Sequence, residues 1–203
     1  MIEDDAELDG EELGDVDLTG VEASGVHLTG CTFRQSLLTG ARLTKVRMRG
    51  VRFDGCDLSG ALLEDAVLSD VTFERCRMTG FVLAGARLAD VRFVGCKLDD
   101  AILRPVTGSG VRFEDTTLVA ADLAGITLTS SSSFERCDLS GATTTKSRVR
   151  GTRLVGCRLE GVRGATGLAG TVVDPTAVVP LGEALLAELG VVVDAGDAGA
   201  DDR

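Results

Sequence analysis

The sequence predicts an all-β solenoid in which the chain completes one four-sided coil about every twenty residues. Two regularities carry this prediction. A five-residue pattern runs from Ala6 to Thr166, and within it like residues recur at intervals of twenty. With 203 residues, the chain is long enough for one domain with a substantial core.

Within each five-residue repeat the third position is large and apolar, and the first is small or β-branched. The exceptions at the third position are Ala23, Gly108, Thr144 and Gly164. Glu11 is the only charged residue at a first or third position. Because an unpaired charge is costly to bury, these two positions are predicted to face the interior and the other three to face water.

A helix cannot bury these positions, because its apolar stripe requires spacings of three and four residues. A long straight strand would alternate with a period of two and drift out of phase. A chain that turns once per repeat satisfies the pattern, with the fifth position at a corner. Glycine occupies many of these corners, as at Gly20, Gly40 and Gly60, where a tight turn is needed.

The twenty-residue period indicates four repeats per coil. Phe33, Phe53, Phe73, Phe93 and Phe113 follow one another at this interval, and Phe134 comes after one extra residue in the serine run 130–133. Like residues should therefore stack from coil to coil. The repeats fill about eight coils, which at about 4.8 Å per strand gives a rod roughly 38 Å long.

The repeats CDLSG (56–60), ADLAG (121–125) and VDLTG (16–20) resemble those of the pentapeptide-repeat proteins. This resemblance extends over residues 6–166 and implies a right-handed quadrilateral β-helix. Local distortion is expected at Gly108 and at 142–146, where the pattern weakens.

The remaining segments are assigned from composition. Residues 1–5 are predicted to be a disordered acidic N-terminus, 167–193 a C-terminal cap with a short helix, and 194–203 a disordered acidic tail. The cap helix should cover 181–190, because a solenoid end exposes apolar side chains and strand edges. Its candidate packing residues share one side of that helix: Leu181, Leu185, Leu186 and Leu189.

Few residues suggest catalysis or a cofactor. Five of the six cysteines fall at first positions of one side, which favours packing over zinc or redox chemistry. His27, the single histidine, lies at an outward position, and the carboxylate pair Asp99 and Asp100 lacks a cleft. We therefore expect no enzyme activity, no cofactor and no metal.

The net charge of −11 comes from the two ends of the chain. Residues 1–22 hold ten acidic groups and no Lys or Arg, and the body between the ends is close to neutral. Basic clusters at 42–52 and 146–163 could contact phosphates, but the lack of exposed aromatic residues disfavours nucleic acid as a partner. The sequence contains no membrane-spanning run and no secretory signal, which indicates the cytoplasm and no membrane contact.

One outward column is apolar. Leu62, Val82 and Ile102 are spaced by twenty and should form a contiguous row, with Ala84 beside it. Such a row is a candidate protein-contact surface, in a homodimer or with another protein. The alternative is that a terminal segment of the same chain covers it.

These features predict a non-enzymatic scaffold that presents a rigid face to a protein partner. The resemblance implies an alternative, because some pentapeptide-repeat proteins bind the topoisomerase gyrase as DNA mimics and give antibiotic tolerance. The near-neutral body disfavours gyrase as the partner. A continuous negative stripe along one side would support mimicry, and alternating signs would support the scaffold.

Overall fold

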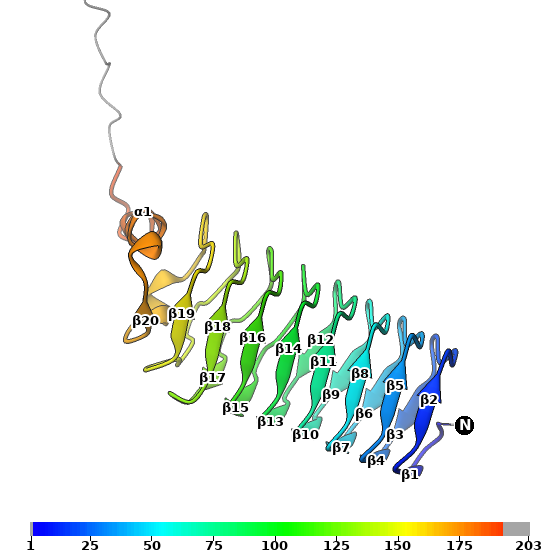
Figure 1. The fold of residues 1–203 in the computed structure, drawn as a ribbon. Coiled ribbons are helices and arrows are strands. Elements are labelled where there is room, and N and C mark those ends of the chain that lie inside the picture. Colours follow the sequence, from blue (N-terminus) through cyan, green and yellow to red (C-terminus); the bar gives the residue numbers. More distant parts are fainter. Residues whose placement is uncertain (1, 193–203) are drawn as a thin grey trace, which may run out of the picture.

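The computed structural model describes residues 2–192 and shows a straight solenoid whose coils stack along one axis (Figure 1). Three sides of the coil carry parallel strands, and partners in neighbouring strands are twenty residues apart over most of the rod. The predicted fold class is confirmed, as is the assignment of four repeats to each coil.

The β1 face is a seven-stranded parallel sheet in the order β1-β4-β7-β10-β13-β15-β17. Its strands are β1 (Glu7–Asp9), β4 (His27–Thr29), β7 (Arg47–Arg49), β10 (Val67–Ser69), β13 (Arg87–Ala89), β15 (Thr107–Ser109) and β17 (Thr127–Leu128).

The β2 face follows in each coil and is a nine-stranded sheet. Its strands are β2 (Glu12–Gly14), β5 (Thr32–Arg34), β8 (Arg52–Asp54), β11 (Thr72–Glu74), β14 (Arg92–Val94), β16 (Arg112–Glu114), β18 (Ser133–Glu135), β19 (Arg153–Val155) and β20 (Val172–Val173). β20 lies beyond the last predicted repeat, so this face continues past Thr166.

The other two sides complete the coil. The bridge face has single-residue bridges from Asp17 to Arg158 in place of strands. The β3 face contains β3 (Glu22–Ser24), β6 (Arg42–Thr44), β9 (Leu62–Glu64) and β12 (Val82–Ala84), and continues as bridges through Ile102 to Arg163. Corner residues adopt left-handed backbone angles, as at Gly60 (φ 64°) and Asp65 (φ 52°).

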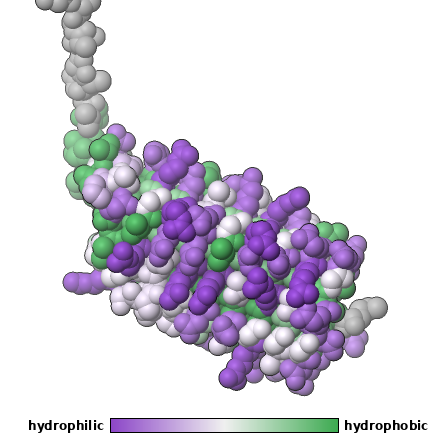
Figure 2. Space-filling model, in the orientation of Figure 1, coloured by the Kyte–Doolittle hydropathy of each residue, from purple (hydrophilic) through white to green (hydrophobic). Residues whose placement is uncertain are grey.

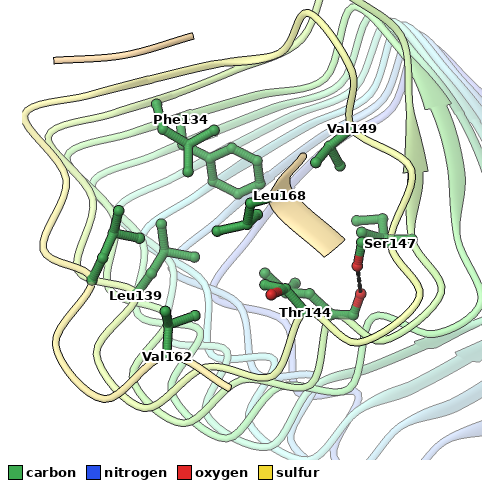
Figure 3. A pocket seen from close by; sticks show the side chains of 11 residues that line it. Phe134, Leu139, Thr144, Ser147, Val149, Val162 and Leu168 are labelled. Atoms are coloured by element: carbon green, nitrogen blue, oxygen red, sulfur yellow. Dashed lines mark hydrogen bonds between the residues drawn. The ribbon is translucent and has the colours of Figure 1, made fainter. Parts of the chain in front are cut away.

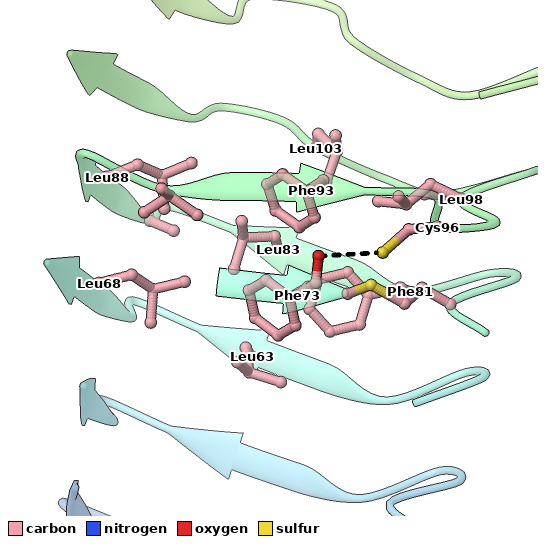
Figure 4. Packing of buried hydrophobic residues seen from close by; sticks show 14 of the residues in the cluster. Leu63, Leu68, Phe73, Phe81, Leu83, Leu88, Phe93, Cys96, Leu98 and Leu103 are labelled. Carbon is pink, nitrogen blue, oxygen red and sulfur yellow. Dashed lines mark hydrogen bonds between the residues drawn. The ribbon is translucent and has the colours of Figure 1, made fainter. Parts of the chain in front are cut away.

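The interior is built from the first and third positions, as predicted. The phenylalanines at intervals of twenty form one stack, which includes Phe73 and Phe93 with centroids 5.0 Å apart (Figure 4). Cys96 donates its S–H to the carbonyl oxygen of Phe73 at 3.3 Å, so the thiol satisfies a backbone group within the core.

The two weak repeats keep the register of the solenoid. Gly108 pairs with Leu88 on one side and Leu128 on the other, so the expected distortion is absent there. Thr143 bridges Asp122 and Arg163, while the Thr144 hydroxyl donates to the carbonyl of Gly164 at 2.8 Å. Hydrogen bonding between coils holds the backbone in place where the large third residue is missing.

Near the C-terminal end the shorter Thr144 leaves a small internal cavity of about 10 Å³. Figure 3 shows Phe134, Leu139, Val149 and Leu168 around it, with Ser147 bonded to the carbonyl oxygen of Leu123 at 2.9 Å. A cavity of this size holds at most about one water molecule, so it is a packing defect and no ligand site.

Residues 2–5 belong to the solenoid, contrary to the predicted disorder of this segment, and Met1 lies outside the described residues. Ile2 is 5% exposed and joins the core. The backbone N–H of Asp5 donates to the carbonyl oxygen of Ser24 at 2.8 Å, and Ser24 N–H donates to Asp4 Oδ1 at 2.8 Å. Because most of these residues are acidic, the sequence analysis overlooked Ile2, which packs against the first coil.

The C-terminal cap consists of η1 (Ala165–Leu168), η2 (Pro175–Ala177) and α1 (Val178–Glu188). α1 begins three residues before the predicted helix and ends two residues earlier. Within residues 2–192, no helix combines the length and the apolar character that crossing a membrane requires. The predicted tail at 194–203 lies outside the described residues.

Candidate protein-contact surface

The structure brings Leu62, Val82 and Ile102 together on the β3 face. Val82 is the register partner of Leu62, and it forms a bridge with Ile102. All three side chains are half-buried and lie on successive coils about 4.8 Å apart. We call this row the apolar column.

An ion pair lies at each end of the apolar column. Arg42 lies beside Leu62 in the sheet and pairs with Glu22 at 3.6 Å. Beyond Ile102, Asp122 pairs with Arg104 at 2.8 Å. The column is therefore a short apolar strip, roughly 10 Å long, with a charged pair above and below it.

A shallow hollow of about 490 Å³ adjoins the column at Leu62. Its lining is mostly polar and includes Asp4, Ser24, Thr44 and Glu64. The β3 face thus offers apolar area beside hydrogen-bonding groups, which is the composition of an ordinary protein interface.

The cap helix does not bury the four leucines that the sequence assigned to packing. Leu181 and Leu186 are half-buried, but Leu185 is 38% and Leu189 75% exposed. α1 instead packs through Ala184 and Leu181 against Val162 and Ala165. The small alanine allows close approach, and the exposed Leu185 and Leu189 lie outside the packing side that the sequence assigned to them.

The cap also exposes apolar residues that the sequence analysis missed. Figure 2 shows hydrophobic residues gathered at this end of the rod, while hydrophilic side chains dominate the visible face of the coils. We define the C-terminal apolar surface by its exposed members: Val172, Val178, Val179, Leu185, Leu189, Val191 and Val192. The adjacent valines in the sequence were the available signal, since they lie outside the five-residue pattern.

The cysteine ladder is placed as predicted, at buried first positions. Cys56, Cys76 and Cys96 each donate to a carbonyl of the preceding coil at 3.3–3.5 Å, and Thr116 makes the same contact at 3.2 Å. The hydrogen bond with Cys76, together with burial, raises the pKa of the Cys56 thiol far above its ordinary value. Among the described residues, no three His, Cys, Asp or Glu side chains are arranged to hold a metal.

The residues considered for catalysis lie on open surfaces. His27 is half-exposed on the β1 face, with Nδ1 3.9 Å from a carboxylate oxygen of Glu7. Asp99 pairs with Lys97 at 3.5 Å on the bridge face, and Asp100 occupies the next corner. None of these groups faces the one enclosed cavity described above.

On the bridge face, side chains of opposite charge pair between neighbouring coils. On the bridge face Asp57 pairs with Arg77 at 3.9 Å, and Asp138 pairs with Arg158 at 3.6 Å. Within residues 2–192, no outward column has carboxylates on more than two successive coils. The described surface therefore has no continuous negative stripe, and on the bridge face carboxylates and arginines stand side by side.

Comparisons with known proteins agree with the repeat. A family model described as a pentapeptide repeat region matches residues 46–123, and one for pentapeptide repeats in eight copies matches residues 4–35. Together they match more than half of the chain. No curated protein matches this sequence.

Solved structures with a similar chain path include two repeat proteins. The plasmid-mediated fluoroquinolone resistance protein QnrB1 is 20% identical; the match covers 94% of this chain and 92% of that one, with a TM-score of 0.48. HetL, from the cyanobacterium Nostoc sp. strain PCC 7120, is involved in heterocyst differentiation regulation. It is 21% identical over 83% of this chain and 87% of its own, with a TM-score of 0.38.

Proposed function

We propose, since this chain belongs to the pentapeptide-repeat family, that it is a non-enzymatic scaffold presenting a rigid face to a protein partner. The observation that carries this proposal is the apolar column with its flanking ion pairs. Every coil is held in register by backbone hydrogen bonds to its neighbours, so the three side chains have fixed spacing before any partner arrives. Such pre-organisation lowers the entropy cost of binding.

The side chains of the β3 face indicate what kind of surface a partner must present. Burying Leu62, Val82 and Ile102 could contribute roughly 4–6 kcal/mol before association costs are subtracted. The flanking pairs Arg42–Glu22 and Arg104–Asp122 add specificity, because a partner must match a charged pair at each end. A stable interface buries about 800 Å² on each side, so the hollow beside Leu62 would be part of the contact.

The simplest partner is a second copy of the chain, related by a two-fold axis. The experiment compares the wild type with a variant in which Leu62, Val82 and Ile102 are changed to Ser. A matched control changes Leu37, Val94 and Val119 to Ser, three outward apolar residues on other faces. We expect the column variant to lose mass in analytical ultracentrifugation, or to lose a protein that wild type and control both retain in a pull-down.

Two results would contradict this assignment. An unchanged mass and unchanged partners in the column variant would make the column incidental. A loss of mass on changing Val178, Val179 and Leu189 to Ser, with no effect of the column variant, would move the contact to the C-terminal apolar surface. If the wild type is already a monomer, a lower melting temperature of the column variant would indicate that the chain's own terminal segment covers the column.

The alternative is a gyrase-binding DNA mimic that gives antibiotic tolerance. Duplex DNA carries one negative charge per about 1.7 Å, and a mimic must reproduce that density along one side. The alternation of Asp57 with Arg77 and of Asp138 with Arg158 counts against it. We expect no inhibition of gyrase supercoiling at micromolar concentration, and inhibition at lower concentrations would favour the alternative.

A further inference from the structure

The β1 face carries a groove that differs in charge from the rest of the rod. Two adjoining hollows of about 560 and 390 Å³ share Val67 and Ser69 and extend from His27 to Thr127. Their floor consists of short side chains such as Val67, Ala89 and Ser109. We call this surface the β1-face groove.

Arginines line the groove without carboxylates between them. The register His27–Arg47–Val67–Arg87–Thr107–Thr127–Arg148 forms one column, and Arg49 lies in the neighbouring column. From His27 to Arg148 neither column contains an acidic residue. Carboxylates border the groove only at the corners, as Asp65, Asp70 and Asp90.

The groove arginines also lack ion pairs within the described part of the chain. Elsewhere eight arginines have a carboxylate within 4.0 Å: Arg34, Arg42, Arg52, Arg75, Arg77, Arg104, Arg136 and Arg158. Arg47, Arg49, Arg87 and Arg148 are exposed and have no such partner there. Their guanidinium donors are available for an external carboxylate.

We propose that the β1-face groove binds an extended acidic segment of a protein partner. Residues two apart on a strand stand about 6.8 Å apart, so Arg47 and Arg49 flank a channel one extended chain wide. Arg148 lies one coil beyond the hollows, at the end of the same column, and five coils from Arg47. That distance is about 24 Å, which an extended peptide spans in about seven residues. Carboxylates at its two ends and centre would meet Arg47, Arg148 and Arg87.

The dimensions and composition favour a peptide over nucleic acid. The two columns stand about 6.8 Å apart, too close for a duplex to enter between them. A single strand would need aromatic platforms for its bases, and all seven phenylalanines are buried. Val67 and Ala89 on the floor of the groove can pack against apolar or small side chains that lie between the acidic residues of the peptide.

The negative net charge does not prevent this binding. Glu7 and the other acids of the first coil lie four coils, about 19 Å, from Arg87. The Debye length in physiological salt is about 8 Å, so the acids of the first coil are largely screened from Arg87.

The test measures binding of a fluorescein-labelled peptide of seven glutamates by fluorescence anisotropy in low salt. The groove variant changes Arg47, Arg49 and Arg87 to Gln. The matched control changes Arg92, Arg112 and Arg153 to Gln; these are three exposed arginines of the β2 face that also lack ion pairs among residues 2–192. Both variants lose the same charge, and a labelled twelve-nucleotide thymidine strand is the nucleic-acid probe.

We expect saturable peptide binding that the groove variant weakens about tenfold and the control less than twofold, as expected for three charge-assisted contacts. Equal weakening in both variants, or no saturable binding, overturns the proposal. Tighter binding of the thymidine strand that depends on the groove arginines would assign the surface to nucleic acid instead. The variant with Leu62, Val82 and Ile102 changed to Ser should bind the peptide as tightly as the wild type. This test of the groove therefore does not depend on the proposed function of the apolar column.

Discussion

The ring of Phe73 lies parallel to that of Phe93, with centroids 5.0 Å apart and planes inclined by 5°. Phe53 stacks on the other side of Phe73 at 4.9 Å, and Phe81 contacts it at a tilt. Phe73 is therefore surrounded by aromatic rings at the centre of the rod. We expect Phe73→Ala to lower the free energy of unfolding by about 3–5 kcal/mol in urea denaturation, because the cavity cannot collapse between rungs. A loss below about 1 kcal/mol, or a similar loss in the outward control Thr72→Ala, would contradict the role of the stack.

Leu83 and Arg92 test which positions of the repeat face the core. Leu83 is 1% exposed, and Arg92 is exposed on the β2 face. Leu83→Lys should lower the melting temperature severely, since burying an unpaired ammonium costs several kcal/mol. Arg92→Glu should change stability by no more than about 0.5 kcal/mol. Comparable melting temperatures in the two variants would show that the inward and outward positions are wrongly assigned.

Cys56 should make stability fall at alkaline pH. The hydrogen bond with Cys76 and burial raise the pKa of its thiol in the folded protein, so the folded state keeps a proton that the unfolded state loses. This contribution is complete below the unfolded thiol pKa of about 8.5 and is lost as pH rises above it. By pH 10 the loss should reach about 2 kcal/mol for this one thiol.

The variant Cys56→Thr isolates that effect. Thr116 occupies the same column and donates to the same class of carbonyl, so threonine fits this environment. We expect the variant to have the melting temperature of the wild type at pH 7. Between pH 8 and pH 10 its melting temperature, followed by circular dichroism, should fall less than that of the wild type. An identical alkaline decrease in wild type and variant would show that Cys56 does not cause it.

Gly108 gives a test in which the repeat pattern and the structure disagree. Leucine is the usual third residue, so the pattern favours Gly108→Leu as stabilising. The Cβ atom of a side chain at position 108 would lie 2.6 Å from Val111 Cγ2 and 3.0 Å from Leu128 Cδ2. We therefore expect a loss of about 1–3 kcal/mol from overpacking, measured by thermal unfolding.

The control for this prediction is Ser109→Leu, which adds the same side chain to the same strand on its outward side. It should melt close to the wild type. A stabilised Gly108→Leu protein would mean that Val111 and Leu128 move aside readily.

The sequence determined the coil because its signal is periodic and local. The exclusion of charge from first and third positions identified Leu83 and Phe73 as interior, and the interval of twenty predicted their stacking partners. Weak repeats did not break the solenoid at Gly108, because main-chain bonds to two neighbouring coils outweigh one missing side chain. The apolar column was also predictable, since its residues are related by the repeat itself.

Only the tertiary structure decided what lies outside that repeat. The burial of Ile2 and the exposure of Leu189 depend on how each end of the chain meets the last coil, which no periodicity encodes. The ion pairs depend on side-chain reach between coils, so the structure alone separated paired Arg52 from Arg47 in the groove. The repeat dictates where each backbone rung lies, whereas contacts at the ends and across the surface follow from three-dimensional proximity.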